Sequence, residues 1–378
     1  MNIVSTTLDS QSGHHESGAE QHIQMASALE EVERRASARV GKQDVQRVKR
    51  LDLLSHAMGG IGRILIVVSF EPIVFVLGVL SLWVHKQLQA IELGHTVLHG
   101  VYDGLPGAEA YRSKTYRWAA PIDEESWRYG HNVRHHTSTN IAGKDPDIRF
   151  GPVRLTEGTP WQPGHTRQLP FTFLMLFPNF AFLTNLHFTG LHDAYFDNSR
   201  SGFDFLPDRS TESVRGAWRK ALRKFAPYYL VEYVFWPLLA GPFFWKVLLG
   251  NWLSEKLRDV YSAATIFCGH VGPEVASYPA GTQSHSKGEW YARQIEASQN
   301  FKVPRPLSVL CGGLDFQIEH HLFPKLPPAR LREIAPEVRA IVEKHGLKYQ
   351  TDTWPRVLFR ALGWINYLSR DHGAVSGA

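Results

Sequence analysis

The chain has 378 residues, of which 43% are hydrophobic and 12% aromatic, and its formal net charge is +5. This composition could fill a large single domain, but a mean hydropathy of -0.23 is low for a polytopic protein, so a few membrane spans would have to coexist with a large polar part. The two cysteines exclude a disulfide framework and a four-cysteine iron–sulfur cluster, and no motif for nucleic-acid binding accompanies the positive charge.

The first forty residues contain no apolar core. They are rich in Ser, Gln, Glu and His and lack the apolar segment of a signal peptide, so we expect residues 1–40 to be a disordered tail, and we expect removal of residues 1–30 to leave activity nearly intact. Residues 31–50 are charged and predict a helix with seven basic residues. This basic segment fits either a solvated helix face or a cytoplasmic flank that faces lipid headgroups.

Two apolar stretches follow, at residues 51–70 and 73–93, and Glu71-Pro72 between them predicts a turn. A helix of twenty residues rises about 30 Å, which is enough to cross the hydrocarbon core of a bilayer. We therefore expect a helical hairpin that returns to the side from which it started.

Histidines then recur in three short motifs along the chain. They are His95 and His99 in GHTVLH, His131, His135 and His136 in HNVRHH, and Gln317, His320 and His321 in QIEHH. Residues three or four positions apart share one face of a helix, so each motif can present ligands in one direction. The stretch between the first two motifs is polar and holds no span, which places both motifs on the same aqueous side. A single HxxxH is weak evidence for a metal site, but three motifs together are strong evidence.

Three apolar stretches lie between the second and third motifs, at residues 169–191, 226–245 and 246–269. An odd number of crossings would place QIEHH across the membrane from its partners, so one stretch cannot cross. Prolines, asparagines and a histidine interrupt the first, which predicts an interfacial or half-buried helix. The other two predict a second hairpin, giving four crossings in all. Its charged residues should face protein, pair with one another or lie near the interface: Glu255, Lys256, Arg258 and Asp259.

Seven histidines in three motifs are too many for one tetrahedral zinc ion, which closes at four ligands. Two metal ions fit the set better. Ligation by imidazole also suits iron, which can activate dioxygen, whereas zinc cannot change its redox state.

The order of GHTVLHG, WRYGHNVRHHTSTNIAGKDPDI and QIEHHLFPKLP resembles that of the membrane-bound fatty acid desaturases, over residues 50 to 350. The resemblance implies an all-α integral membrane protein with four transmembrane helices, arranged as two hairpins, and a cytoplasmic helical domain that holds the histidine motifs. It also implies a non-haem centre of two iron ions, which uses dioxygen and two electrons to remove two hydrogens from an acyl chain. The iron ligands that it implies are His95, His99, His131, His135, His136, His270, His320 and His321.

Gln317 stands where many members of that family carry histidine. Its amide oxygen can ligate a metal or accept a hydrogen bond, but it is a weaker donor of electrons than imidazole. Asp145 and Asp147 in GKDPD either orient ligating imidazoles by accepting their second N–H or form an ordinary Asp-Pro-Asp turn, and Glu319 could orient an imidazole likewise. For His187 and His192, a structural role is favoured over a place in the acyl tunnel or beside the ligands.

The chemistry that the resemblance implies needs electrons from outside. The chain has no His-Pro-Gly-Gly haem motif and no GxGxxG after a strand, which indicates a separate donor such as ferredoxin or cytochrome b5 with its reductase. The fatty acyl substrate could be carried on coenzyme A, an acyl carrier protein or a phospholipid. We expect a multi-pass membrane protein with the active site and both termini in the cytoplasm, a desaturase domain at 41–350 and an extension at 351–378. A histidine-motif membrane hydroxylase is the first alternative, and a non-enzymatic metal-binding membrane protein is the second.

Overall fold

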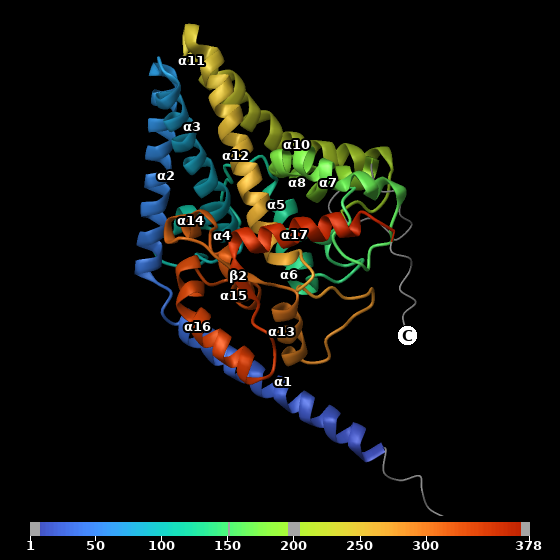
Figure 1. Ribbon diagram of the computed structural model, residues 1–378. Coiled ribbons are helices and arrows are strands. Elements are labelled where there is room, and N and C mark those ends of the chain that lie inside the picture. The colour runs from blue at the N-terminus through green and yellow to red at the C-terminus, as the bar shows by residue number, and fades with distance from the viewer. Residues whose placement is uncertain (1–7, 150–151, 196–204, 372–378) are drawn as a thin grey trace, which may run out of the picture.

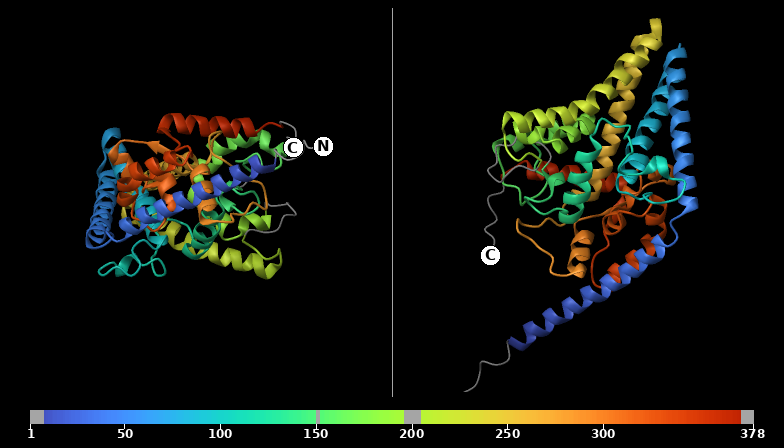
Figure 2. Two further views of the ribbon diagram at one scale, coloured as in Figure 1. Left: turned by 90° about the horizontal axis from the view of Figure 1, so that it is seen from below. Right: turned by 180° about the vertical axis from the view of Figure 1, so that it is seen from behind.

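The computed structural model describes residues 8–149, 152–195 and 205–371, and these are mostly helical (Figure 1). One end of the molecule is a bundle whose helices run side by side both in Figure 1 and in the view from behind (Figure 2, right). Its elements are α2 (Lys42–Val68), α3 (Pro72–Gln87), the π-helix η8 (Val231–Phe235), α11 (Trp236–Leu239) and α12 (Phe244–His270). α10 (Thr211–Leu230) leads obliquely into η8 and α11.

The other end holds a further set of helices and, among the described residues, a sheet of two strands. Its elements are α1 (Leu8–Ser37), α13 (Lys287–Glu296), α14 (Arg305–Leu310), α15 (Gln317–Leu322), α16 (Pro328–Lys344) and the parallel strands β1 (Asn300–Lys302) and β2 (Thr351–Thr353). α8 (Phe180–Phe188) and α17 (Trp354–Leu368) lie across the direction of α12, between the two ends (Figure 1).

Short helices connect these elements. Before the second histidine motif they are η1 (Leu88–His95), α4 (Thr96–Leu98), η2 (Glu109–Tyr111) and α5 (Glu124–Trp127). After it come η3 (Arg128–His135), α6 (His136–Ser138), η4 (Pro146–Ile148), η5 (Pro163–Arg167), α7 (Gln168–Phe171), η6 (Thr172–Leu176), η7 (Phe177–Asn179), α9 (Leu191–Tyr195), η9 (Gly241–Phe243) and η10 (Leu314–Phe316).

Among the described residues, three helical segments are long and apolar enough to cross a membrane: Lys42–Val68, Pro72–Leu98 and Pro163–Phe188. The first two coincide with the predicted spans at 51–70 and 73–93. The third covers most of the stretch predicted as interfacial, and it is divided into five short elements that lie across α12 rather than beside it (Figure 1). The predicted spans at 226–245 and 246–269 are helical but are not among these apolar segments. The first carries Glu232, and the second carries Glu255, Lys256, Arg258 and Asp259.

Those charged residues have protein partners, as the sequence analysis expected. Glu255, Arg258 and Asp259 are buried, and Lys256 donates a hydrogen bond to the side chain of Asn179. Glu232 on η8 accepts hydrogen bonds from Lys86 at 2.6 Å and from Arg63 at 2.8 Å, so one carboxylate joins α2, α3 and η8. Pairing of this kind lowers the cost of placing charge inside a helical bundle.

The prediction of a disordered tail at 1–40 is wrong for its described part. α1 begins at Leu8, and its residues Met25, Leu29 and Val32 are buried in a cluster with α13, α15 and α16. The apolar residues recur at helical spacing among polar ones, so their burial depends on partner helices far along the chain that composition alone does not reveal. Gly288 on α13 permits the close approach, because a Cβ there would lie 2.3 Å from the carbonyl oxygen of His22.

Loss of this packing should destabilise the protein. We expect Leu29→Ala, which truncates a fully buried side chain of α1, to lower the free energy of unfolding by about 2–5 kcal/mol. Ile23→Ala on the same helix removes an exposed side chain and should change it by less than about 0.5 kcal/mol. Unfolding in detergent by denaturant measures both. Equal stability of the two variants would contradict the docking of α1, whereas deletion of residues 1–30, expected from sequence to be harmless, should now destabilise.

The segment after residue 350 is part of the same fold rather than an extension. Strand β2 pairs in parallel with β1, with Asn300 opposite Thr351. α17 buries Val357, Ala361 and Ile365 against α12 and its neighbours. A boundary at 350 would therefore cut a sheet and expose a buried helix face.

Candidate metal centre

The first two histidine motifs lie on π-helices that change into short α-helices. η1 ends at His95, and His99 follows α4; η3 carries His131 and His135, and His136 opens α6. The sequence predicted helices here but not their π geometry, which is rare and frequent at functional sites. Gly94 makes room for the site, because a Cβ there would lie 1.8 Å from Nε1 of Trp118.

The third motif and one further histidine complete the set. α15 carries Gln317, His320 and His321, all buried, and His270 is the last residue of α12. All eight predicted histidines therefore converge, although the motifs are separated by up to about two hundred residues of sequence.

Two groups of imidazoles form within this cluster, each with ligand atoms within 4.8 Å of one another. One group contains His95, His99, His131 and His320, and the other contains His135, His270 and His321. His136 lies between them: its Nε2 is 3.2 Å from Nε2 of His131, and its ring stacks on that of His321 with centroids 4.3 Å apart. The two groups lie next to each other, and a third set of possible ligands, His131, His135 and Asp147, joins them.

The chemistry of these groups fits metal ions. The Nε2 atoms of His320 and His321 and Oε1 of Gln317 are buried with no hydrogen-bond partner, which is costly unless a ligand satisfies them. In the first group, Nε2 of His95 lies 3.2 Å from that of His99 and 3.3 Å from that of His131. Burial lowers the pKa of His99, His320 and His321 well below the usual value, so these rings are neutral and keep a free lone pair.

The carboxylates of the GKDPD segment contact histidines of the second motif. This agrees with the first of its two interpretations, in which Asp145 and Asp147 orient imidazoles. Nδ1 of His135 donates to Oδ1 of Asp145 at 2.9 Å, and Nδ1 of His131 lies 3.4 Å from Oδ2 of Asp147. Burial alone would lower the pKa of His135, but Asp145 and Asp147 raise it to about 9. Asp145 also accepts from the backbone N–H groups of Asn140 and Asp147, so it forms the turn and orients the imidazole at once.

Backbone and amide groups orient the other histidines. Nδ1 of His270 donates to the carbonyl of Ala297 at 3.2 Å, which directs Nε2 toward Gln317 and the other histidines. Nδ1 of His321 lies 3.1 Å from Oε1 of Gln294, which also accepts from the hydroxyl of Thr139. Sequence analysis missed Gln294 and Thr139. Thr139 stands close to the second motif, but nothing in the sequence around Gln294 marks it.

The structure gives partners to three residues whose roles the sequence left open: Gln317, Glu319 and His187. Gln317 lies in the second group, with Nε2 2.7 Å from Nε2 of His270. Glu319 does not contact a histidine in the way suggested; it accepts hydrogen bonds from Asn300 and Tyr349, because its side chain points to the strand β1 side of α15. His187 is buried and donates to the carbonyl of Pro146 at 3.1 Å, so it braces the GKDPD turn.

Comparison with known proteins decides the family. The profile of the family described as fatty acid desaturase matches residues 70–353. The NADPH-dependent stearoyl-CoA 9-desaturase of Mycobacterium tuberculosis is 30% identical over 336 residues, which cover 87% of this chain and 76% of that protein. The chain belongs to the fatty acid desaturase family.

The names of other relatives give lipid-linked acyl groups as substrates. The sn-1 linoleoyl-lipid 6-desaturase of Synechocystis is 26% identical over 80% of this chain and 84% of its own length. The acyl-lipid (7-3)-desaturase of Diacronema lutheri is 32% identical over 59% of this chain and 48% of its own length. Membership makes this chain an oxidoreductase that desaturates fatty acyl groups.

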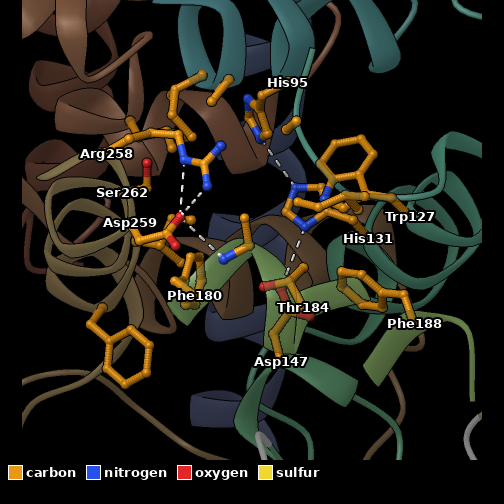
Figure 3. Close-up of a pocket in the computed structure, with 18 of the residues that line it drawn as sticks. His95, Trp127, His131, Asp147, Phe180, Thr184, Phe188, Arg258, Asp259 and Ser262 are labelled. Carbon is orange, nitrogen blue, oxygen red and sulfur yellow. Dashed lines mark hydrogen bonds and ion pairs between the residues drawn. The ribbon is translucent and has the colours of Figure 1, made fainter. Parts of the chain in front are cut away.

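A pocket opens beside the histidine groups of this desaturase (Figure 3). Its walls are mainly apolar and include Trp118, Ile122, Trp127, Phe180 and Phe188. His95, His131, His135, His270 and Gln317 line it as well, so both groups of imidazoles face the same space. Trp127 stacks on the ring of His131, with centroids 4.4 Å apart, and places one edge of the pocket against the histidines. Such a space suits an alkyl chain.

Proposed function

We propose that this protein is an oxygen-dependent fatty acyl desaturase that introduces a carbon–carbon double bond with two non-haem iron ions and an external electron donor. The observation that carries the proposal is the apolar pocket lined by imidazoles from both buried groups. An alkyl chain there would lie against the metal-binding atoms, out of water.

We assign the metal ligands by group. His95, His99, His131 and His320 would hold one ion, and His135, His270 and His321 the other, with His136 between them and Gln317 available to the second. When bound, an iron pair supplies activation of dioxygen and oxidation of an unactivated C–H bond. Asp145, Asp147, Gln294 and the carbonyl of Ala297 hold the ring orientations that keep each Nε2 directed inward.

The remaining pocket residues bind and position the substrate. Trp127 stacks on His131 and Phe188 lines the pocket nearby, so a bound chain would be confined to the space beside the imidazoles. Confinement of this kind supplies the orientation that a reaction at one chosen carbon requires. The apolar walls also exclude water from the oxidising centre.

We propose four crossings, with the active site and both termini in the cytoplasm. In addition to the two apolar helices of the first hairpin, large apolar side chains are exposed on η8, α11 and α12, including Phe235, Leu238, Leu239 and Trp252. Exposure of many such side chains along adjacent helices is expected where lipid replaces water. α8 would then lie at the interface, and the basic flank before residue 51 would mark the cytoplasmic side.

The relatives and the sequence support a choice of acyl carrier and electron donor. The relatives named above act on stearoyl-CoA or on lipid-linked acyl groups by name, so coenzyme A and phospholipid are the favoured carriers, with an acyl carrier protein as the third. A separate ferredoxin, or cytochrome b5 with its reductase, would deliver the electrons, because the chain carries no haem or dinucleotide motif.

Gas chromatography with mass spectrometry tests the function. Expression in a host that lacks desaturases should produce fatty acid esters that have lost two hydrogens, and the fragmentation pattern locates the double bond. Esters that have gained an oxygen atom would instead identify a hydroxylase. An unchanged fatty acid profile, with the protein present in membranes and iron and a donor supplied, would contradict both enzymatic functions.

Asp145→Asn tests the orientation of the ligands. Asparagine keeps the shape of the side chain but removes the charge that holds His135, so iron affinity should fall about 10- to 100-fold. Asp208→Asn, an exposed aspartate at the start of α10, is the matched control and should retain wild-type affinity. Competition with a chelator measures both. Equal iron retention by the two variants would show that Asp145 serves only the turn.

A further inference from the structure

The acyl pocket follows one face of α12. The residues of α12 that line it are Arg258, Asp259, Ser262, Ile266, Phe267 and His270. From His270 back to Arg258 the helix axis rises about 18 Å, at 1.5 Å per residue. The pocket therefore extends from the metal groups toward the helical bundle over about that distance.

A buried ion pair lies at the far end of this path. The structure describes α12 throughout, and no residue of it before Arg258 lines the pocket. Arg258 and Asp259 are each only 1% exposed, and the guanidinium reaches Oδ1 of Asp259 from Nε at 3.0 Å and from Nη2 at 2.7 Å. Figure 3 shows Arg258, Asp259 and Ser262 on one side of the pocket and His131 and Trp127 on the other.

Neighbouring elements fix the pair in place. Nη1 of Arg258 donates to the hydroxyl of Tyr228 on α10 at 3.1 Å, and that hydroxyl donates to Glu255 at 2.9 Å. Oδ1 of Asp259 also accepts from the backbone N–H of Ala181 on α8, at 3.4 Å. Three helices therefore hold the two side chains.

A charged pair held in this way is a firmer barrier than an apolar side chain. An apolar wall can repack around an extra methylene at modest cost. Displacing Arg258 from Asp259 would leave a buried charge unpaired, which costs far more. A methyl terminus gains nothing by entering this polar contact, since it offers no hydrogen bond in exchange.

We propose that the Arg258–Asp259 pair closes the acyl site and sets how many carbons can lie beyond the metal centre, so that it determines the chain length accepted. This inference rests on the proposed desaturase function. It assigns specificity to a pair that contacts no metal ligand and takes no part in the oxidation.

The test compares products from a host fed saturated acyl chains of increasing length. Arg258→Ala combined with Asp259→Ala removes both charges together and opens the end of the pocket. The ratio of long-chain to short-chain product should rise about 10- to 200-fold for each additional methylene accommodated. Arg258→Met combined with Asp259→Leu removes the charges but keeps most of the volume, and should extend the length limit by less than the double alanine variant does. Ala181→Val fills space beside Asp259 and should shift the products to shorter chains.

The outcomes separate this inference from the proposed function. An unchanged chain-length distribution in the double alanine variant and in Ala181→Val would overturn the inference while leaving desaturation intact. If the double alanine variant does not accumulate, the shift or its absence in Ala181→Val decides the inference alone. A wild-type chain that forms no unsaturated product contradicts the proposed function itself.

Discussion

Replacing His95, His135 or His321 with alanine should abolish desaturation and release bound iron. His95 belongs to the first imidazole group, and His135 and His321 belong to the second, so the three variants probe both metal positions. Loss of a residue that merely orients a ligand costs roughly 10- to 100-fold in metal affinity or activity, so loss of a ligand should exceed about 100-fold. Product formation in membranes and iron content of the purified variants measure the effect.

A matched histidine variant separates this effect from a general loss of histidine. His285 is exposed in the loop before α13 and belongs to neither group. His285→Ala should keep wild-type turnover and iron content. Retention of activity and full iron content in all three site variants would refute the assignment of the ligands.

Labelling of single cysteines should show that the histidine motifs and the hairpin turns lie on opposite sides of the membrane. In a version without Cys268 and Cys311, cysteines at Lys114 and Lys325 should react with a membrane-impermeant thiol reagent only from the cytoplasmic side. Cysteines at Pro72 and Phe243, in the two hairpin turns, should react only from the opposite side. All four positions are exposed, unlike Ser113, which is buried against Asp103. We expect no labelling of either pair from the wrong side. Four crossings place all three histidine motifs on one side of the membrane and both hairpin turns on the other.

Labelling of the cysteines at positions 114 and 325 from opposite faces of the membrane would mean that Pro163–Phe188 crosses the bilayer. The second and third motifs could then not share a centre. Reaction of all four cysteines from one side would contradict the hairpins themselves.

The sequence singled out the histidines that the structure brings together, but not all of the groups that hold them in place. His95, His131 and His320 could be singled out because their type and spacing are local properties of the sequence. The π geometry of η1 and η3 could not, because it depends on tertiary contacts such as that between Trp118 and the carbonyl of Ala90.

Dependence on tertiary contacts also explains why the sequence did not predict the role of Gln294 or the packing of α1. Gln294 lies 27 residues from His321 in the sequence and gains its role only when α13 packs against α15. Leu29 and Val32 look like isolated apolar residues in a polar segment until α13 and α16 supply their partners. Contacts between distant segments decide both cases, and a single sequence does not record them.

The pairing of charges could be expected from the sequence, but its geometry could not. Lipid exposure is so costly for Glu255, Arg258 and Asp259 that protein contacts were required. Which partner each would take, and that Arg258 and Asp259 would line the acyl pocket, follows only from the positions of α8 and α10 beside α12.

Iron stoichiometry tests the central claim most directly, because the claim is that two groups of histidines hold two ions in one chain. Purified protein, loaded with ferrous iron under anaerobic conditions and freed of excess metal, should contain about two iron ions per chain, as the two imidazole groups require. Alanine in place of His99 should lower that value, whereas His285→Ala should not. A wild-type value of one or none, or a preference for a single zinc ion under competition, would contradict the account.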